Sequence, residues 1–188
     1  DEQLTTLGGR LHTHRRRLLD KVMEAATPVY ARLSGGEVLT ARICDRCGLP
    51  PIQHGDPDVG EVTEALRREL GRRRHEERAR KVSLVGPHRD DIVFAIEGHD
   101  ARAYASQGQQ RTVALAWKWA EVEVVKTVLG RTPVLLLDDV MSELDETRRS
   151  ALTELISREI QTFVTTTNMG YFADFPAGFA RVVPIGGV

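Results

Sequence analysis

The stretch Leu135-Leu136-Leu137-Asp138-Asp139, followed two residues later by Ser142-Glu143-Leu144-Asp145, decides the fold that this sequence predicts. A short and wholly apolar run, here beginning at Val134, is typical of a strand that is covered on both faces in a parallel sheet. Ligands of open α/β sheets bind just beyond the carboxyl ends of the strands. Two carboxylates there can hold a hydrated divalent cation and orient a water molecule. The alternative is that Asp138 and Asp139 only end the strand and cap the next turn.

A second polar stretch, Ser106-Gln107-Gly108-Gln109-Gln110-Arg111, opens a helix that the sequence predicts from Ser106 to about Leu129, where Gly130 ends it. Exposed N–H groups and the positive end of the helix dipole favour an anion at such a position. Gly108 lets a phosphate approach the backbone closely, and Ser106 can donate its hydroxyl proton to it. The alternative is an ordinary serine cap with a polar first turn.

The remaining elements predict an α/β fold. Strand, helix and strand follow one another after Lys81, which argues for a parallel sheet. We therefore predict a boundary near Lys81, with a helical segment at 1–81 and the sheet part at 82–188. The elements expected from periodicity and turn residues are a helix over 11–30 preceded by Gly8 and Gly9, a short strand over 37–43, a charged helix over 61–81, hairpin strands over 92–96 and 101–105, a helix capped by Asp145, a strand over 162–166 and a further one over 181–185.

Composition excludes several classes of protein. The 188 residues carry a net charge of −1, so nucleic-acid binding has to come from local basic patches. The candidate patches lie on the helical segment and are Arg15-Arg16-Arg17 and Arg72-Arg73-Arg74. No apolar run approaches the roughly 20 residues that span a bilayer. Two cysteines cannot make a disulfide framework. Cys44 and Cys47, with His54 nearby, have the spacing of half a zinc site, and an incidental pair is the alternative.

The order of the two polar stretches resembles that of ABC-type ATPases, and the closer match is to the RecF family. Ser-x-Gly-Gln opens a long helix, an apolar strand ends in paired acids, and a short Leu-Asp loop follows. The segments that look like motifs of that family are Gly86 to Asp91, Ala105 to Thr112, Leu135 to Asp145 and Gln161 to Thr167. The resemblance is dense from Gly86 to Asn168. It implies a partial ABC-ATPase head, with a P-loop NTPase-like sheet and flanking helices, joined to a segment of a helical arm.

The resemblance also implies roles for individual residues. Asp138 would act on Mg²⁺ through its water shell, and Asp139 would orient the attacking water. Asp145 would belong to the loop that crosses a dimer interface, and Thr166 or Thr167 would occupy the switch position after the next strand. The residues of the signature motif, which touches the γ-phosphate of ATP bound by a partner subunit, would be Ser106, Gln107, Gly108 and Gln109.

The function implied by the resemblance is DNA replication, repair and recombination in the bacterial cytoplasm, at the nucleoid, within the SOS response. The intact protein would bind ATP and Mg²⁺, form an ATP-dependent homodimer, grip duplex and gapped DNA, and act with RecO and RecR to place RecA at single-strand gaps. Turnover of ATP would be slow, because an aspartate stands at Asp139 where many relatives carry a glutamate.

The chain contains no Gly-x-x-x-x-Gly-Lys-Ser/Thr sequence, which in ATPases cradles the β- and γ-phosphates. We therefore expect it to be the C-terminal portion of such a protein and to be inactive by itself. Two alternatives remain open: a non-catalytic module that binds DNA or a partner, and the head of another SMC-like ATPase.

Overall fold

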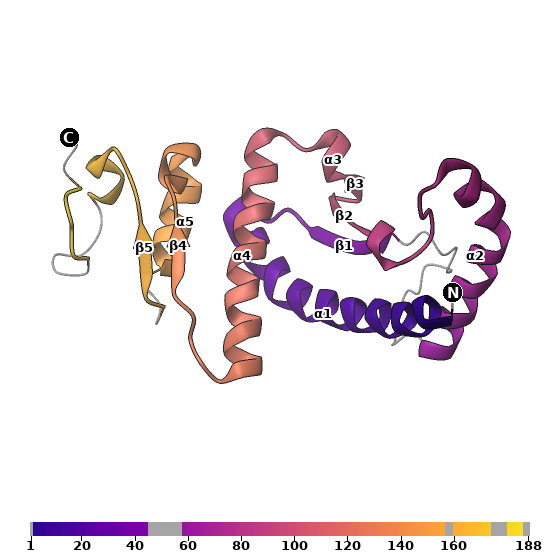
Figure 1. The fold of residues 1–188 in the computed structure, drawn as a ribbon. Helices are drawn as coiled ribbons and strands as arrows, with labels where there is room; N and C mark the ends of the chain where they lie inside the picture. The colour runs from indigo at the N-terminus through magenta and orange to yellow at the C-terminus, as the bar shows by residue number, and fades with distance from the viewer. Residues whose placement is uncertain (1, 45–57, 157–159, 174–179, 186–188) are drawn as a thin grey trace.

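Two long helices form the centre of the fold, α1 (Glu2–Ser34) and α4 (Gln107–Leu129), and they pack against each other (Figure 1). The computed structural model describes residues 2–44, 58–156, 160–173 and 180–185. On one side of α4 lie a small antiparallel sheet and α2 (Val59–Arg80), and on the other lie two parallel strands with their own helix. Ser106 caps α4, and Gly130 ends it in the left-handed region at φ 62°, so both predicted ends are confirmed.

The helix α1 is longer than its periodicity predicts, because Gly8 and Gly9 lie within it and do not precede it. Both glycines are buried against α2. A Cβ on Gly9 would lie 2.3 Å from the Thr63 hydroxyl, and one on Gly8 would lie 3.1 Å from Leu66. Close approach of two helix backbones thus accounts for the glycines, and the prediction that they precede the helix is wrong.

A three-stranded antiparallel sheet is formed by β1 (Leu39–Cys44), β2 (Asp91–Ile96) and β3 (His99–Asp100). The predicted hairpin is confirmed, but its second strand ends after two residues. The Asp100 carboxylate accepts the N–H of Arg102 at 2.8 Å and caps the short helix α3 (Ala101–Tyr104), so the strand expected over 101–105 is wrong. The short helix η1 (Pro87–Arg89) leads into β2.

The predicted boundary near Lys81 does not separate two independent packing units. The strand β1, which precedes Lys81, pairs with β2, which follows it, in a register that sets Leu39 opposite Ile96. The helix α1 also packs on α4. A division into 1–81 and 82–188 stays a prediction.

The second sheet has two parallel strands, β4 (Leu135–Leu137) and β5 (Thr162–Val164). Between them run the short helix η2 (Val140–Glu143) and the helix α5 (Glu146–Ile156). The N–H of Arg148 donates to the Asp145 carboxylate at 2.9 Å, which confirms the predicted cap of α5. The parallel pair with its connecting helix confirms the α/β class. The short helix η3 (Met169–Phe172) follows β5, and residues 181–185 are not a strand.

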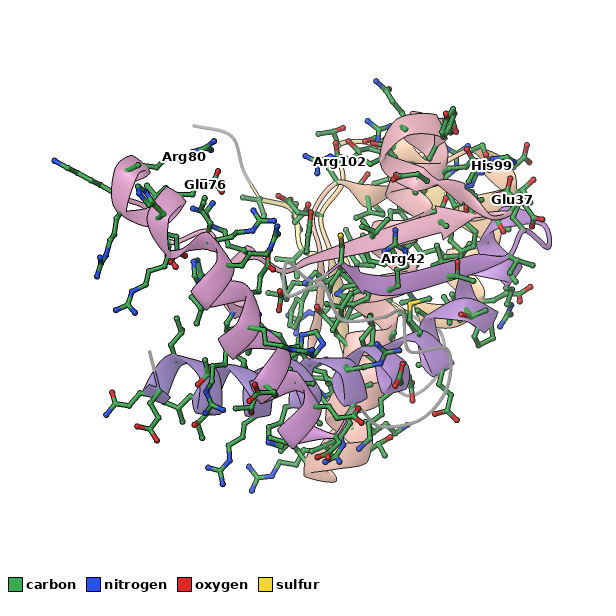
Figure 2. The ribbon with its side chains drawn as sticks, turned by 90° about the vertical axis from the view of Figure 1, so that its right-hand side faces the viewer. Glu37, Arg42, Glu76, Arg80, His99 and Arg102 are labelled. Atoms are coloured by element: carbon green, nitrogen blue, oxygen red, sulfur yellow. The ribbon has the colours of Figure 1, made fainter. Side chains whose placement is uncertain are left out.

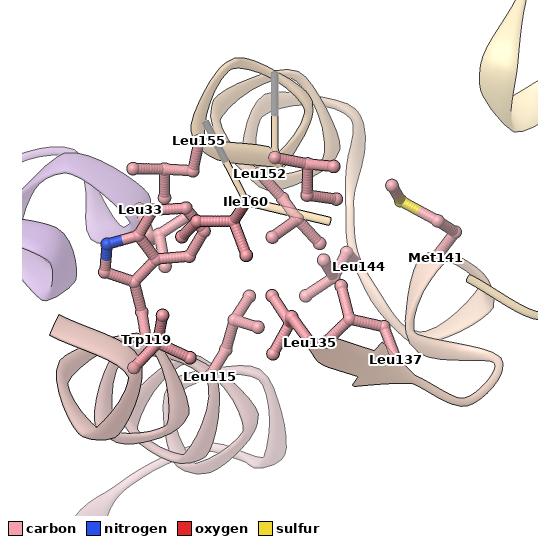
Figure 3. Packing of buried hydrophobic residues seen from close by; sticks show 12 residues of the cluster. Leu33, Leu115, Trp119, Leu135, Leu137, Met141, Leu144, Leu152, Leu155 and Ile160 are labelled. Atoms are coloured by element: carbon pink, nitrogen blue, oxygen red, sulfur yellow. The ribbon is translucent and has the colours of Figure 1, made fainter. Parts of the chain in front are cut away.

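The main core lies between α4, α5 and the inner face of β4 (Figure 3). Trp119 is 7% exposed there, whereas Trp117 is only half-buried and packs edge-on against Phe94. The other labelled core residues in Figure 3 are Leu33, Leu115, Leu135, Leu137, Met141, Leu144, Leu152, Leu155 and Ile160.

The other face of the β4–β5 sheet is open within the described residues. Leu136 and Phe163 lie opposite each other in the register and are 72% and 57% exposed. The sequence predicts a strand covered on both faces, and the described part of the chain covers only one. Adjacent exposed apolar residues on one sheet face mark a surface that another segment or protein normally covers.

Candidate functional site

The two predicted acids lie together at the carboxyl end of β4, and the threonine that directly follows β5 contacts both of them. The hydroxyl of Thr165 donates to the Asp138 carboxylate. The same oxygen accepts the backbone N–H of Asp139 at 3.0 Å. Asp139 adopts a left-handed backbone at φ 47°, and its carboxylate lies 2.9 Å from the Ser142 hydroxyl. Both aspartates are exposed, so their carboxylates are held in place and open to solvent.

The threonine that contacts the acids is Thr165, and it is not one of the two predicted for the switch position. The hydroxyl of Thr166 accepts the N–H of Asn168 at 3.1 Å and so closes the next turn. Thr167 is exposed in the bend that follows β5. Whether Thr167 contacts nucleotide stays a prediction.

The start of α4 is fixed by a reciprocal capping box. The Gln109 N–H donates to the Ser106 hydroxyl at 3.2 Å, and the Ser106 N–H donates to the Gln109 side-chain oxygen at 2.9 Å. The Gln109 amide nitrogen donates to the Glu37 carboxylate at 2.8 Å. The other oxygen of Glu37 accepts from the Tyr30 hydroxyl at 2.8 Å. Burial and the neighbouring Glu37 carboxylate raise the pKa of Tyr30, which therefore stays protonated.

The remaining signature residues leave the first turn of α4 accessible. Ser106 and Gln107 are exposed, and Gly108 is half-buried. The guanidinium of Arg148 lies beside Gly108, 3.6 Å from where a Cβ would be. The first turn of α4 contains no acidic residue. The N–H groups of this turn therefore present the positive end of the helix dipole to one edge of the protein.

The start of α4 and the carboxyl end of β4 lie at the same edge of the structure (Figure 1). An ion pair joins α4 to the segment that follows β4. Arg111 of α4 lies 3.2 Å from the Glu143 carboxylate, and Arg148, which lies beside Gly108, pairs with Asp145. The Arg148 backbone N–H and its charge lower the pKa of Asp145. The two polar stretches singled out in the sequence therefore form one continuous polar edge.

The predicted DNA-binding arginines lie away from that edge and are partly ion-paired. Arg72 and Arg73 both bind Glu69, at 2.7 and 2.5 Å. The hydrogen bond from Arg72, reinforced by Arg73, lowers the pKa of Glu69 to about 2 despite its burial. Arg74 likewise takes part in a polar or electrostatic contact within the protein. Figure 2 shows the far end of α2, with Glu76 and Arg80, projecting away from the sheet.

The other basic cluster lies on α1. Arg15 donates to the carbonyl of Pro87 and lies 3.8 Å from the Asp90 carboxylate. Arg16 and Arg17 have interactions as well. DNA binding by either cluster stays a prediction, and it would have to compete with these contacts.

Two other classes of site are not seen in the part of the chain that the structure describes. No group of three or more His, Cys, Asp or Glu side chains there is arranged to hold a metal ion. None of the helices in that part is long and apolar enough to cross a membrane. The predicted zinc half-site includes Cys47 and His54, which lie outside the described residues.

Comparison with known proteins shows what the chain as a whole is similar to. No protein-family model matches the chain. It is 45% identical over 175 residues to the DNA replication and repair protein RecF of Synechococcus sp. strain JA-3-3Ab, which covers 92% of the chain and 45% of that relative. It is 42% identical over 170 residues to RecF of Lysinibacillus sphaericus strain C3-41, with 90% and 45% covered.

Solved structures agree with the sequence comparison. A structure of the recombination mediator protein RecF in the RecFOR pathway, described as RecF-ATPrS, superposes with a TM-score of 0.76 and 31% identity. It covers 90% of this chain and 44% of that one. A second, described as RecF-ATP, has a TM-score of 0.75. The chain thus spans a little under half the length of the proteins it matches.

The fold and the polar edge together define the class of protein: the chain is a partial ABC-type ATPase head with attached helices. Within that class the proteins it matches are RecF proteins, to which it is similar in sequence and in structure over about nine tenths of its length.

Three residues of the site were not predicted from the sequence. Thr165 belongs to a run of three threonines, and only the register of β5 selects it. Tyr30 and Glu37 precede Gln109 by 72 residues or more in the sequence, and no local pattern connects them with it. The sequence does carry one signal for them, an acid that follows the Gly35-Gly36 break after α1.

Proposed function

We propose that this chain is the part of a DNA-repair ATPase head that carries the signature motif at the start of α4 and the paired acids after β4. The complete head would close into a homodimer around ATP and Mg²⁺. The single observation that carries the proposal is the shared edge, where the Arg111–Glu143 pair joins α4 to the segment after β4 and Arg148, which pairs with Asp145, lies beside Gly108 at the start of α4. In the dimer, the amides and hydroxyl at Ser106 and Gly108 would meet the γ-phosphate bound by the partner subunit.

The acids at the end of β4 have the chemistry that Mg²⁺ requires. Both Asp138 and Asp139 are exposed carboxylates at the carboxyl end of a parallel strand, and Mg²⁺ prefers oxygen ligands that leave it several waters. Bound there, the ion would neutralise charge on the phosphates. Asp138 would hold it through water, and Asp139 would orient the attacking water. Since Asp139 is one methylene shorter than a glutamate, we expect slow turnover of ATP.

The resemblance further supports DNA as the ligand of the helical segment. Arg72, Arg73 and Arg74 on α2, with Arg15, Arg16 and Arg17 on α1, would neutralise phosphates of duplex or gapped DNA. By analogy with the matched RecF proteins, the partners would be RecO, RecR and RecA, and the setting would be the bacterial cytoplasm and its nucleoid, within the SOS response. ATP binding in the dimer would then be coupled to the grip on DNA.

The chain by itself would not turn over ATP. Its 188 residues contain no phosphate-binding loop of the Gly-x-x-x-x-Gly-Lys-Ser/Thr type, so the β- and γ-phosphates lack their main cradle. A second function, as a non-catalytic module that binds DNA or a partner, is favoured for the chain alone by the open sheet face at Leu136 and Phe163.

The test is the association state of the complete protein with and without ATP. Ser106→Arg should abolish ATP-dependent dimers in analytical ultracentrifugation, because the long cation blocks the trans phosphate contact. ATP binding to the monomer should remain. Thr127→Arg, at the other end of α4, is the matched control and should dimerise normally. A Ser106→Arg protein that dimerises like wild type would show that the start of α4 does not contact the partner's nucleotide.

A further inference from the structure

The carboxylate of Glu37 connects two elements that are far apart in the sequence. One of its oxygens accepts from the Gln109 amide in the first turn of α4, and the other accepts from Tyr30 in α1, both at 2.8 Å. Figure 2 shows Glu37 at the end of the sheet, in the connection between α1 and β1. None of the motifs that resemble the RecF family includes Glu37 or Tyr30.

The contact uses the whole polar group of Gln109. Its side-chain oxygen accepts the Ser106 N–H, and its side-chain nitrogen donates to Glu37. The amide is therefore engaged within its own subunit on both sides. The sequence predicts that Gln109 belongs to the nucleotide-binding motif, and the geometry shows how it can belong to that motif by holding the helix start in place.

The connection that carries Glu37 is itself fixed. The Glu37 N–H donates to the Ser34 hydroxyl at 3.2 Å. The next residue, Val38, donates its N–H to the Glu97 carboxylate at 2.5 Å and accepts the Glu97 N–H at 3.0 Å. Tyr30 is fully buried, so its hydroxyl would lose the carboxylate that accepts its hydrogen bond if Glu37 moved. Glu37 is therefore held by both neighbours in a single orientation.

We propose that Glu37 is a positioning residue for the nucleotide-dependent interface: by holding the Gln109 amide, it sets the place and angle at which the start of α4 meets the partner subunit's triphosphate. This inference rests on the proposed function. Small displacements matter at such a site, since a misplacement of about 1 Å can cost on the order of 100-fold in a reaction that depends on orientation.

The test exchanges the two polar groups in the complete protein. Gln109→Glu keeps an oxygen for the Ser106 N–H, so the capping box survives, but it sets a second carboxylate against Glu37. The double variant Gln109→Glu with Glu37→Gln restores a donor and an acceptor in the reversed order. In this variant the new amide oxygen at position 37 can still accept from the Tyr30 hydroxyl. The measurements are ATP affinity of the monomer, ATP-dependent dimerisation and thermal unfolding.

We expect Gln109→Glu to weaken ATP-dependent dimerisation by about tenfold or more, with monomer ATP affinity unchanged, and the double variant to recover most of the loss. Glu37→Gln alone should remain close to wild type, because its amide can serve both neighbours. A double variant no better than Gln109→Glu would overturn the inference, since the Gln109 amide would then be needed by the nucleotide itself. Equal losses in dimerisation and thermal stability would also overturn it, because they indicate a purely structural role. If the wild-type protein does not dimerise with ATP, the proposed function fails instead.

Discussion

Thr165, the residue after β5, donates its hydroxyl to Asp138 and accepts the N–H of Asp139, so one side chain contacts both acids at the end of β4. The relationship depends on the parallel register, which sets Leu137 opposite Val164 and so brings the next residues of both strands together. Asp139 is further held by Ser142. The acids are therefore ordered by contacts from the chain itself, before any ligand arrives, and ordering in advance lowers the cost of binding.

The first prediction concerns this threonine. Thr165→Val keeps the shape of the side chain but removes the hydroxyl, so Asp138 loses a donor and the Asp139 N–H loses an acceptor. We expect ATP turnover by the complete protein to fall by about 10- to 100-fold, because the Asp138 carboxylate loses its donor and the backbone of Asp139 loses the contact that places it. Thr165→Ser keeps the hydroxyl and is the control, which should retain most of the activity in a steady-state ATPase assay. Equal activity of the valine and serine variants would contradict this role.

Those parts of the fold that depend on local signals could be predicted from the sequence. The helix α4 begins at its serine cap and ends at Gly130, because a cap and a left-handed glycine act within a few residues. The apolar run before Asp138 forms a strand in a parallel pair, and Asp145 caps the next helix.

The parts that depend on tertiary packing could not be predicted. Gly8 and Gly9 favour a helix break in the sequence, and only the approach of α2 shows why they lie inside α1. The choice of Trp119 over Trp117 for the core depends on where α5 and β4 pack. The Glu37–Gln109 contact joins residues brought together by the whole fold, so no sequence period reveals it.

The second prediction concerns acid stability. Arg72 and Arg73 lower the pKa of Glu69 from 4.5 to about 2, so the folded state favours the charged carboxylate. The stabilisation is fully present above about pH 4.5 and is lost as the pH falls towards 2. We expect the free energy of unfolding to fall more steeply between pH 5 and pH 3 for wild type than for Glu69→Gln. Urea unfolding at several pH values measures the difference, and parallel pH profiles of the two proteins would contradict it.

The third prediction concerns DNA. Glu69→Gln releases the guanidinium groups of Arg72 and Arg73 from a neighbouring carboxylate. If these arginines contact phosphates, the variant should bind duplex DNA several-fold more tightly at low salt, with a salt dependence steeper by about 0.9 for each added phosphate contact. Glu64→Gln, which releases Arg67, is the control and removes the same charge one turn or more away. Titrations of labelled duplex at several salt concentrations measure the slope. If both substitutions raised the DNA affinity equally, the gain would come from the change in net charge and not from a phosphate contact of Arg72 or Arg73.

The fourth prediction concerns the open face of the β4–β5 sheet. Substitutions at two neighbouring residues of β4 should differ sharply in their effect on the free energy of unfolding. Leu137 is 5% exposed, so Leu137→Ala should destabilise the chain by about 2–5 kcal/mol. Leu136 is 72% exposed, so Leu136→Asn should change the free energy of unfolding of the chain alone by less than about 1 kcal/mol. In the complete protein, where we expect the rest of the head to cover this face, the same Leu136→Asn would bury an amide against apolar groups and cost about 1–3 kcal/mol. Chemical unfolding of both substitutions in both contexts measures the four values. A negligible cost of Leu136→Asn in the complete protein would show that the face stays open there, and that the two parallel strands are not completed into a larger sheet.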